Sequence, residues 1–268
     1  MTRRGLRSGL TAMLLLVLVA APIAAAQAPA FATVAPVRSY EIVARYPHDV
    51  TAFTEGLICL DGKLYEGTGL NGQSELRLVD LQTGAVLESR NLSSDEFGEG
   101  VTILDGMVYQ LTWKSNIAHV YDLESFDEVA SFAYTGEGWG LTTDGMSLIM
   151  SNGSDQIVFR DPETFAITKT ISVRDGEHPV FQLNELEYID GVIWANVWQT
   201  NLIARIDAET GKVIDWLDLS ALDAEVRTAS PDVDVLNGIA WNADIGTVLV
   251  TGKNWPTLFE IRLLPPSA

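Results

Sequence analysis

The string DLQTG at residues 80–84 comes back three times in altered form further along the chain. The later copies are DLESF at 122–126, DPETF at 161–165 and DAETG at 207–211, at steps of 42, 39 and 46 residues. A period of about 40–50 residues indicates one structural unit that is repeated along the chain. The repeat therefore decides the fold.

An Asp-Gly pair precedes each of these strings and lies between runs of alternating apolar residues. The pairs are Asp61-Gly62, Asp105-Gly106, Asp144-Gly145 and Asp190-Gly191. Asp-Gly in this setting is typical of a two-residue β-hairpin turn. Each unit therefore consists of four antiparallel strands, and such units in series are typical of a β-propeller.

The last unit, residues 236–263, has only three strands before the chain ends. The string YEIVARYP at 40–47 resembles the outermost strands of the other units. A strand from this part of the chain would complete the last unit and remove an open sheet edge. We predict an all-β fold, a five-bladed β-propeller of four-stranded antiparallel blades whose last blade is closed by an N-terminal strand, in a single domain of residues 40–268.

The first 26 residues have the features of a secretory signal peptide. Three arginines precede an apolar run from Leu10 to about Ile23, and three alanines follow as in an A-x-A cleavage site. The apolar run is short for a bilayer span, although an uncleaved membrane anchor is the alternative. We expect a secreted or periplasmic protein that starts at Gln27, leaves the membrane after cleavage and has a flexible segment at 27–39.

The chain is strongly acidic, with 36 Asp and Glu against 17 Lys and Arg and a net charge of −19. The signal peptide holds three of the basic residues and no acid, so its removal makes the charge still more negative. This charge argues against nucleic acid as a partner. Cys59 is the one cysteine and lies in an apolar run, so we expect a packed thiol rather than a nucleophile.

Aligning the units on their first turn identifies two rings of equivalent positions. The innermost strands open with Glu55, Glu99, Trp139, Asn184 and Asn237, and the second strands leave the sheet at Gly69, Trp113, Gly153, Trp198 and Lys253. Equivalent inner positions of a propeller face the same axis, so both rings should meet at one mouth of the channel. The polar groups gathered there would form either a satisfied plug or an aromatic-walled ligand pocket.

Motifs for other functions occur only in part. GTGLNG at 67–72 precedes strand-like sequence instead of a helix, which argues against dinucleotide binding. DVDVLNG at 232–238 lacks the spacing and the terminal Glu of a calcium loop. The three histidines His48, His119 and His178 are far apart, so we expect no zinc site, no Ser-His-Asp triad and no cofactor.

Five strings resemble the plant and bacterial type of glutaminyl-peptide cyclotransferase. They are FTEGL at 53–57, FGEGV at 97–101, LNELEYIDGVIWANVWQTN at 183–201, VLNGIAW at 235–241 and VTGKNWPTLFEI at 250–261. The resemblance implies a five-bladed propeller, unrelated in fold to the zinc-dependent animal enzymes. It also implies conversion of the N-terminal Gln of peptides or proteins to pyroglutamate with release of ammonia, and we expect a monomer.

The resemblance further implies roles for individual residues. Glu99 would be the acid/base residue, and the substrate pocket would be formed by Glu55, Trp113, Trp139, Asn184, Trp198 and Lys253. Plant members carry Gln at the position of Glu55, which leaves two roles open for this second carboxylate: binding the substrate ammonium or sharing a proton with Glu99. Three further residues of the 183–201 string are expected to be structural, namely Glu185, Glu187 and Trp194.

These residue types suit the reaction. The α-amine attacks the γ-carboxamide of the same residue, and one carboxylate can take a proton from the amine and return one to the leaving nitrogen. Indole walls can fold the flexible side chain for ring closure, while Asn184 or Lys253 could hold the developing oxyanion. The alternatives are a secreted propeller that binds a peptide or protein without catalysis and a metal-dependent lactone hydrolase.

We predict that the mature protein carries pyroglutamate at its own N-terminus, because cleavage after Ala26 exposes Gln27, a substrate of such an enzyme. Intact-mass analysis should give the mass of residues 27–268 less one ammonia. The Glu99→Gln chain controls for spontaneous cyclisation. Another start site, or an uncyclised Gln27, would contradict the prediction.

Overall fold

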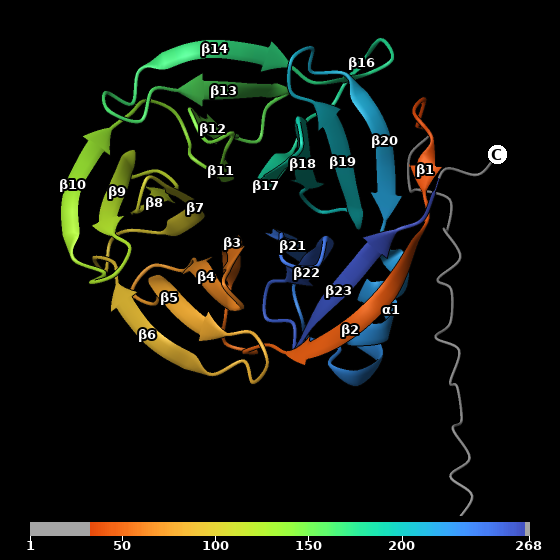
Figure 1. Cartoon of the computed structure of the whole chain (residues 1–268), viewed down its shortest axis with the longest axis horizontal. Helices are drawn as coiled ribbons and strands as arrows, with labels where there is room; N and C mark the ends of the chain where they lie inside the picture. Colours follow the sequence, from red (N-terminus) through yellow and green to blue (C-terminus); the bar gives the residue numbers. More distant parts are fainter. Residues whose placement is uncertain (1–32, 266–268) are drawn as a thin grey trace, which may run out of the picture.

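The computed structural model describes residues 33–265, in which five β-sheets stand around a central axis (Figure 1). The predicted signal peptide lies outside the described residues. Within them, no helix is long and apolar enough to cross a membrane. The predicted five-bladed all-β propeller is confirmed.

The first four blades follow the order of the chain outward from the axis. Blade one has β3 (Thr54–Leu60), β4 (Lys63–Thr68), β5 (Glu75–Asp80) and β6 (Val86–Asn91). Blade two has β7 (Gly98–Leu104), β8 (Met107–Thr112), β9 (Ile117–Asp122) and β10 (Glu128–Ala133). Blade three has β11 (Leu141–Thr143), β12 (Leu148–Met150), β13 (Gln156–Arg160) and β14 (Ile167–Ser172). Blade four has β17 (Leu183–Ile189), β18 (Val192–Val197), β19 (Leu202–Asp207) and β20 (Val213–Asp218), after the short hairpin of β15 (Arg174–Asp175) and β16 (His178–Pro179).

Blade five joins the two ends of the described chain. It has β21 (Leu236–Asn242), β22 (Thr247–Gly252), β23 (Thr257–Leu263) and β2 (Tyr40–Pro47). β2 pairs antiparallel with β23 over its whole length, and the Tyr40 ring is buried in the core of the blade. The predicted closure by an N-terminal strand is confirmed. The one helix of the described chain, α1 (Ser220–Ala229), packs Leu222 and Val226 into the same core.

Blade four carries an additional strand, which the sequence did not suggest. β1 (Val37–Arg38) lies parallel to β20, with Val37 opposite Trp216. The backbone N–H groups of Val34 and Ala35 donate to Asp175 at 2.7 Å each. The segment 27–39, expected to be flexible, therefore ends in hydrogen-bonded structure, while residues 27–32 lie outside the described residues.

Three of the four Asp-Gly pairs form the predicted two-residue turns, with both residues at positive φ. The prediction is wrong for Asp144-Gly145, where Thr143 pairs with Leu148 and the loop has four residues. There the Asp144 carboxylate accepts hydrogen bonds from the backbone N–H groups of Met146 and Ser147. These bonds stabilise a longer loop that begins with Asp144.

The inner strands approach one another closely at the axis. A Cβ atom at Gly100 would lie 2.5 Å from the backbone nitrogen of Leu141, so no side chain fits there. Gly140 meets the backbone of blade four in the same way. Blade four has Glu185 at the equivalent position, and its buried carboxyl accepts a hydrogen bond from the backbone N–H of Leu57 in blade one at 3.3 Å. The axis is therefore closed by backbone contacts and one side chain that crosses it.

Glu187, two residues further along β17, links blade four to both neighbouring blades. It accepts hydrogen bonds from the backbone N–H of Trp241 at 2.8 Å and from Thr142 Oγ1 at 3.2 Å. Burial raises the pKa of its carboxyl to about 7, against the effect of these hydrogen bonds. Like Glu185 it lies within the sheets, in agreement with the structural role expected for both.

We predict that a chain starting at Val50 loses cooperative thermal unfolding. The truncation removes β2, which leaves the ladder of β23 unpaired and exposes the core face covered by Tyr40. Circular dichroism melting of the two chains, with the chain that starts at Gln27 as the control, measures the effect. A sharp transition near the midpoint of the longer chain would show that closure by β2 does not hold the ring together.

Candidate active site

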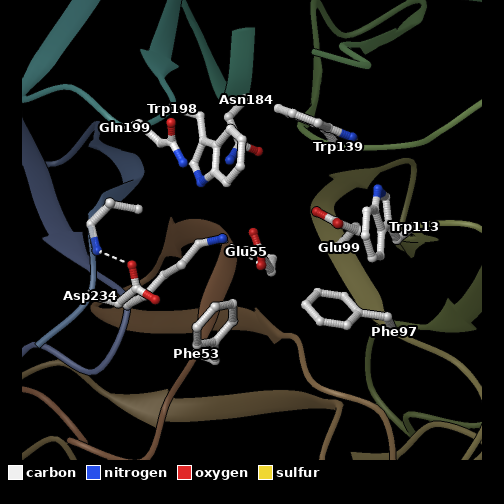
Figure 2. Close-up of a pocket in the computed structure, with 12 residues that line it drawn as sticks. Phe53, Glu55, Phe97, Glu99, Trp113, Trp139, Asn184, Trp198, Gln199 and Asp234 are labelled. Atoms are coloured by element: carbon white, nitrogen blue, oxygen red, sulfur yellow. Dashed lines mark hydrogen bonds and ion pairs between the residues drawn. The ribbon is translucent and has the colours of Figure 1, made fainter. Parts of the chain in front are cut away.

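The two rings identified from the repeat meet at one end of the axis, around a cavity of about 400 Å³ (Figure 2). Twelve residues line it, and all seven residues assigned to the site from the sequence are among them: Glu55, Glu99, Trp113, Trp139, Asn184, Trp198 and Lys253. The other five are Phe53, Phe97, Gln199, Asp234 and Val235. The structure thus brings the predicted site residues together.

The two glycines of the second ring leave space for the aromatic walls. A Cβ atom at Gly69 would clash with the ring of Phe97, and one at Gly153 would lie 2.6 Å from the ring of Trp139. Asn237, the remaining ring member, is fully buried and donates from Nδ2 to Glu55 Oε2 at 3.3 Å. These positions therefore shape the cavity from behind its lining.

Sequence reasoning missed five lining residues, for two different reasons. Phe53, Phe97 and Val235 each stand two positions before an inner-ring residue, so the same repeat alignment could have identified them. Gln199 directly follows Trp198 and Asp234 directly precedes Val235, but the equivalent residues of the other blades do not line the cavity. The repeat therefore gives no signal that these two residues line the cavity.

Glu55 and Lys253 form a buried ion pair, with 2.6 Å between Lys253 Nζ and Glu55 Oε1. The ammonium also lies 4.5 Å from the ring centroid of Phe53. Burial raises the pKa of Glu55 to about 7, although Lys253 opposes the shift. Since Asn237 takes the other oxygen, both carboxylate oxygens of Glu55 have protein partners.

The environment of Glu99 differs from that of Glu55. Its side chain is buried, and no residue of the described chain donates a hydrogen bond to its carboxyl. Burial raises the pKa of Glu99 well above its usual value, and the nearby charge of Glu55 raises it further while Lys253 opposes both. A carboxyl with a raised pKa and no structural partner in a cavity is suited to exchange protons with a ligand.

The indole walls are held by hydrogen bonds and ring contacts. Glu137 Oε2 accepts from the indole N–H of Trp113 at 2.8 Å and from that of Trp139 at 3.0 Å. Partial burial alone would raise the pKa of Glu137, but these bonds and Lys114 lower it. Trp139 meets Trp198 edge to face, with 5.6 Å between the ring centroids. The walls are therefore set before a ligand arrives.

Asn184 supplies an uncommitted polar group. Its Oδ1 atom is buried and has no hydrogen-bond partner within residues 33–265. Buried polar atoms are usually paired, so an orphaned amide that lines a cavity suits a polar ligand. No group of three or more His, Cys, Asp or Glu side chains suited to a metal ion occurs in the described part of the chain. The cavity fits a small, flexible, polar ligand that undergoes proton transfer.

Comparison with known proteins agrees with this geometry. The family described as glutamine cyclotransferase matches residues 13–263. The chain is 42% identical over 235 residues to a glutaminyl-peptide cyclotransferase of Arabidopsis thaliana, which covers 87% of this chain and 73% of that protein. The crystal structure of Myxococcus xanthus glutaminyl cyclase superposes with a TM-score of 0.79 and 37% identity, and covers 85% of this chain and 98% of that one.

We predict that Glu137→Ala loosens the indole walls without unfolding the protein. Both indole N–H groups lose their acceptor, so the near-UV circular dichroism of the tryptophans should weaken while the melting midpoint changes by less than about 4 °C, as for a half-exposed side chain outside the core. The exposed Glu163→Ala chain is the matched control. An unchanged near-UV spectrum would contradict the positioning role of Glu137.

Proposed function

Because the chain belongs to the glutamine cyclotransferase family, we infer that it is a glutaminyl-peptide cyclotransferase, which converts the N-terminal glutamine of peptides and proteins to pyroglutamate with release of ammonia. The observation that carries the mechanism is the contrast between the two cavity carboxyls. Glu55 is held by Lys253 and Asn237, whereas Glu99 has no protein partner among the described residues. Glu99 is therefore the carboxyl that is free to act on the substrate.

Binding first restricts the glutamine side chain. Three indoles and two phenyl rings surround the cavity, so the methylene groups of the substrate pack against flat, rigid surfaces: Trp113, Trp139, Trp198, Phe53 and Phe97. Ring closure needs the α-nitrogen within about 3–3.5 Å of the γ-carboxamide carbon. A folded side chain held in this way makes the intramolecular attack far more frequent than it is in water.

Proton transfer accompanies the exchange of bonds at the carboxamide carbon. A bond forms from the α-nitrogen to this carbon, and the bond from the carbon to the carboxamide nitrogen breaks. Glu99 accepts the proton that the attacking nitrogen loses and donates a proton to the departing nitrogen, which leaves as ammonia. Burial and the charge of Glu55 raise the pKa of Glu99, which makes its carboxylate a stronger base toward the attacking nitrogen than an ordinary carboxylate.

Negative charge develops on the carboxamide oxygen during the attack. Lys253 lies in the cavity as a fixed ammonium with donor capacity beyond its bond to Glu55, and the side-chain Nδ2 of Asn184 is a donor without a hydrogen-bond partner in the described chain. Donors held in place beforehand stabilise such charge strongly in a buried site. We assign this oxyanion contact to Lys253 and Asn184.

Glu55 acts on Glu99 through charge rather than by contact with the reacting atoms. Its carboxylate raises the pKa of Glu99 and holds Lys253 in place. This assignment selects neither of the two roles that the sequence left open for Glu55. We further propose that the enzyme works as a secreted or periplasmic monomer and needs no metal ion.

We predict that Glu99→Gln lowers turnover of a Gln-initiated peptide by at least about 100-fold, since general acid-base catalysis contributes roughly 10²–10⁴. The substitution keeps the shape of the side chain but removes the proton acceptor. Ammonia release measures the rate, and the melting midpoint should stay within a few degrees. Near-normal turnover would contradict the assignment of Glu99.

Glu55→Gln is the matched variant. It should keep most of the activity and shift the acidic limb of the pH–rate profile to lower pH. The reason is that losing the Glu55 charge, and leaving Lys253 unpaired, both lower the pKa of Glu99. Loss of activity in Glu55→Gln together with activity in Glu99→Gln would reverse the two roles.

A further inference from the structure

The exposed residues of the cavity lining mark where a peptide must leave it. Gln199 and Asp234 are exposed, whereas the other ten lining residues are buried or half-buried. Both lie on the same side of the cavity in Figure 2, away from Glu99. Since Gln199 and Asp234 are the exposed part of the lining, a peptide that follows the glutamine would leave the cavity between them.

A second hollow of about 270 Å³ adjoins the cavity on this side and shares Gln199 and Val235 with it. It lies between the loop after β18 and helix α1, and its remaining lining residues are Thr200, Asn201, Leu202, Ser220, Asp223 and Arg227. We propose that this hollow is a subsite for the main chain of the residues that follow the N-terminal glutamine. The proposal rests on the proposed function.

The free polar groups of the hollow match a peptide backbone. The side-chain amides of Gln199 and Asn201 and the hydroxyl of Ser220 have no hydrogen-bond partner within the described chain. Amides and hydroxyls both donate and accept, as the N–H and C=O groups of an extended peptide require. Main-chain recognition of this kind lets the side chains of the substrate vary.

The wall formed by α1 is fixed before a substrate binds. Arg227 donates from Nε to Asp223 at 2.9 Å, from Nη1 to the carbonyl of Val233 at 2.8 Å and from Nη2 to the carbonyl of Asp234 at 3.1 Å. These bonds tie the helix to the loop that carries Asp234 and Val235. A preformed groove loses little entropy when it binds a peptide. The pairing also neutralises Asp223 and Arg227, which leaves the main chain as the feature to be recognised.

A third hollow of about 280 Å³ is the alternative path for the substrate peptide. It shares only Trp198 with the cavity, and its exposed lining includes His178 and Phe181. Its carboxylate, Asp175, already accepts hydrogen bonds from the backbone of Val34 and Ala35. This side has fewer uncommitted polar groups, so the geometry favours the second hollow.

The test compares two neutral substrates, glutaminamide and the amide of Gln-Ala-Ala-Ala, by ammonia release. We expect wild-type kcat/KM to be higher for the tetrapeptide. Asn201→Ala and Ser220→Ala should each lower kcat/KM for the tetrapeptide by about two- to tenfold, the effect of one hydrogen bond, and leave glutaminamide unchanged. Ser220→Trp, which fills the hollow, should bring the tetrapeptide down to the rate of glutaminamide. His178→Ala and Phe181→Ala are the matched controls and should change neither substrate.

Other outcomes of the same measurements would contradict the subsite. Equal kcat/KM for the two substrates in the wild type, or equal losses on both in the Asn201→Ala and Ser220→Ala variants, would overturn the subsite. A tetrapeptide defect confined to His178→Ala or Phe181→Ala would place the peptide in the third hollow instead. An inactive wild type with both substrates would refute the proposed function itself, and with it the subsite.

Discussion

The lack of space at the propeller axis is the constraint on which the rest of the structure depends. Glycines such as Gly100 and Gly140 let the inner strands meet backbone to backbone, and Glu185 crosses the remaining gap to blade one. Each of these positions directly follows an inner-ring residue. The same contacts that close the ring therefore place Glu99, Trp139 and their counterparts at one mouth of the axis. Fold closure and site assembly have a common cause.

Glu55 and Glu99 are buried in the same cavity, but the groups around them favour different protonation behaviour. Glu55 has an ammonium and an amide within hydrogen-bond distance, so its charge is compensated. Glu99 has neither and lies near the charge of Glu55, which favours its protonated form. Environments that separate the behaviour of paired carboxyls are a general route to acid-base catalysis near neutral pH. Burying the Glu99 carboxyl without a partner destabilises the folded state, and the packing of the rest of the propeller offsets this loss of stability.

The repeat allowed the sequence to predict the blades, the closure by β2 and a set of ten positions at one mouth, because equivalent positions of a propeller have equivalent places around one axis. Seven of the ten line the cavity, and these are the seven that the family resemblance selected. The repeat failed where a tertiary contact or a loop decides the outcome. Strand β1 depends on pairing with β20, and the loop at Asp144 depends on side-chain hydrogen bonds to Met146 and Ser147. The residues equivalent to Gln199 and Asp234 in the other blades do not line the cavity, so only the folded chain reveals the side on which the cavity opens.

The most direct test of this account is a crystal structure of the Glu99→Gln protein with a Gln-initiated tetrapeptide bound. In that structure the substrate α-nitrogen should lie within about 3 Å of the side chain at position 99 and about 3–3.5 Å from the γ-carboxamide carbon. The carboxamide oxygen should point toward Lys253 and Asn184. A substrate whose α-nitrogen instead contacts Glu55, with no polar contact at position 99, would contradict the assignment of Glu99.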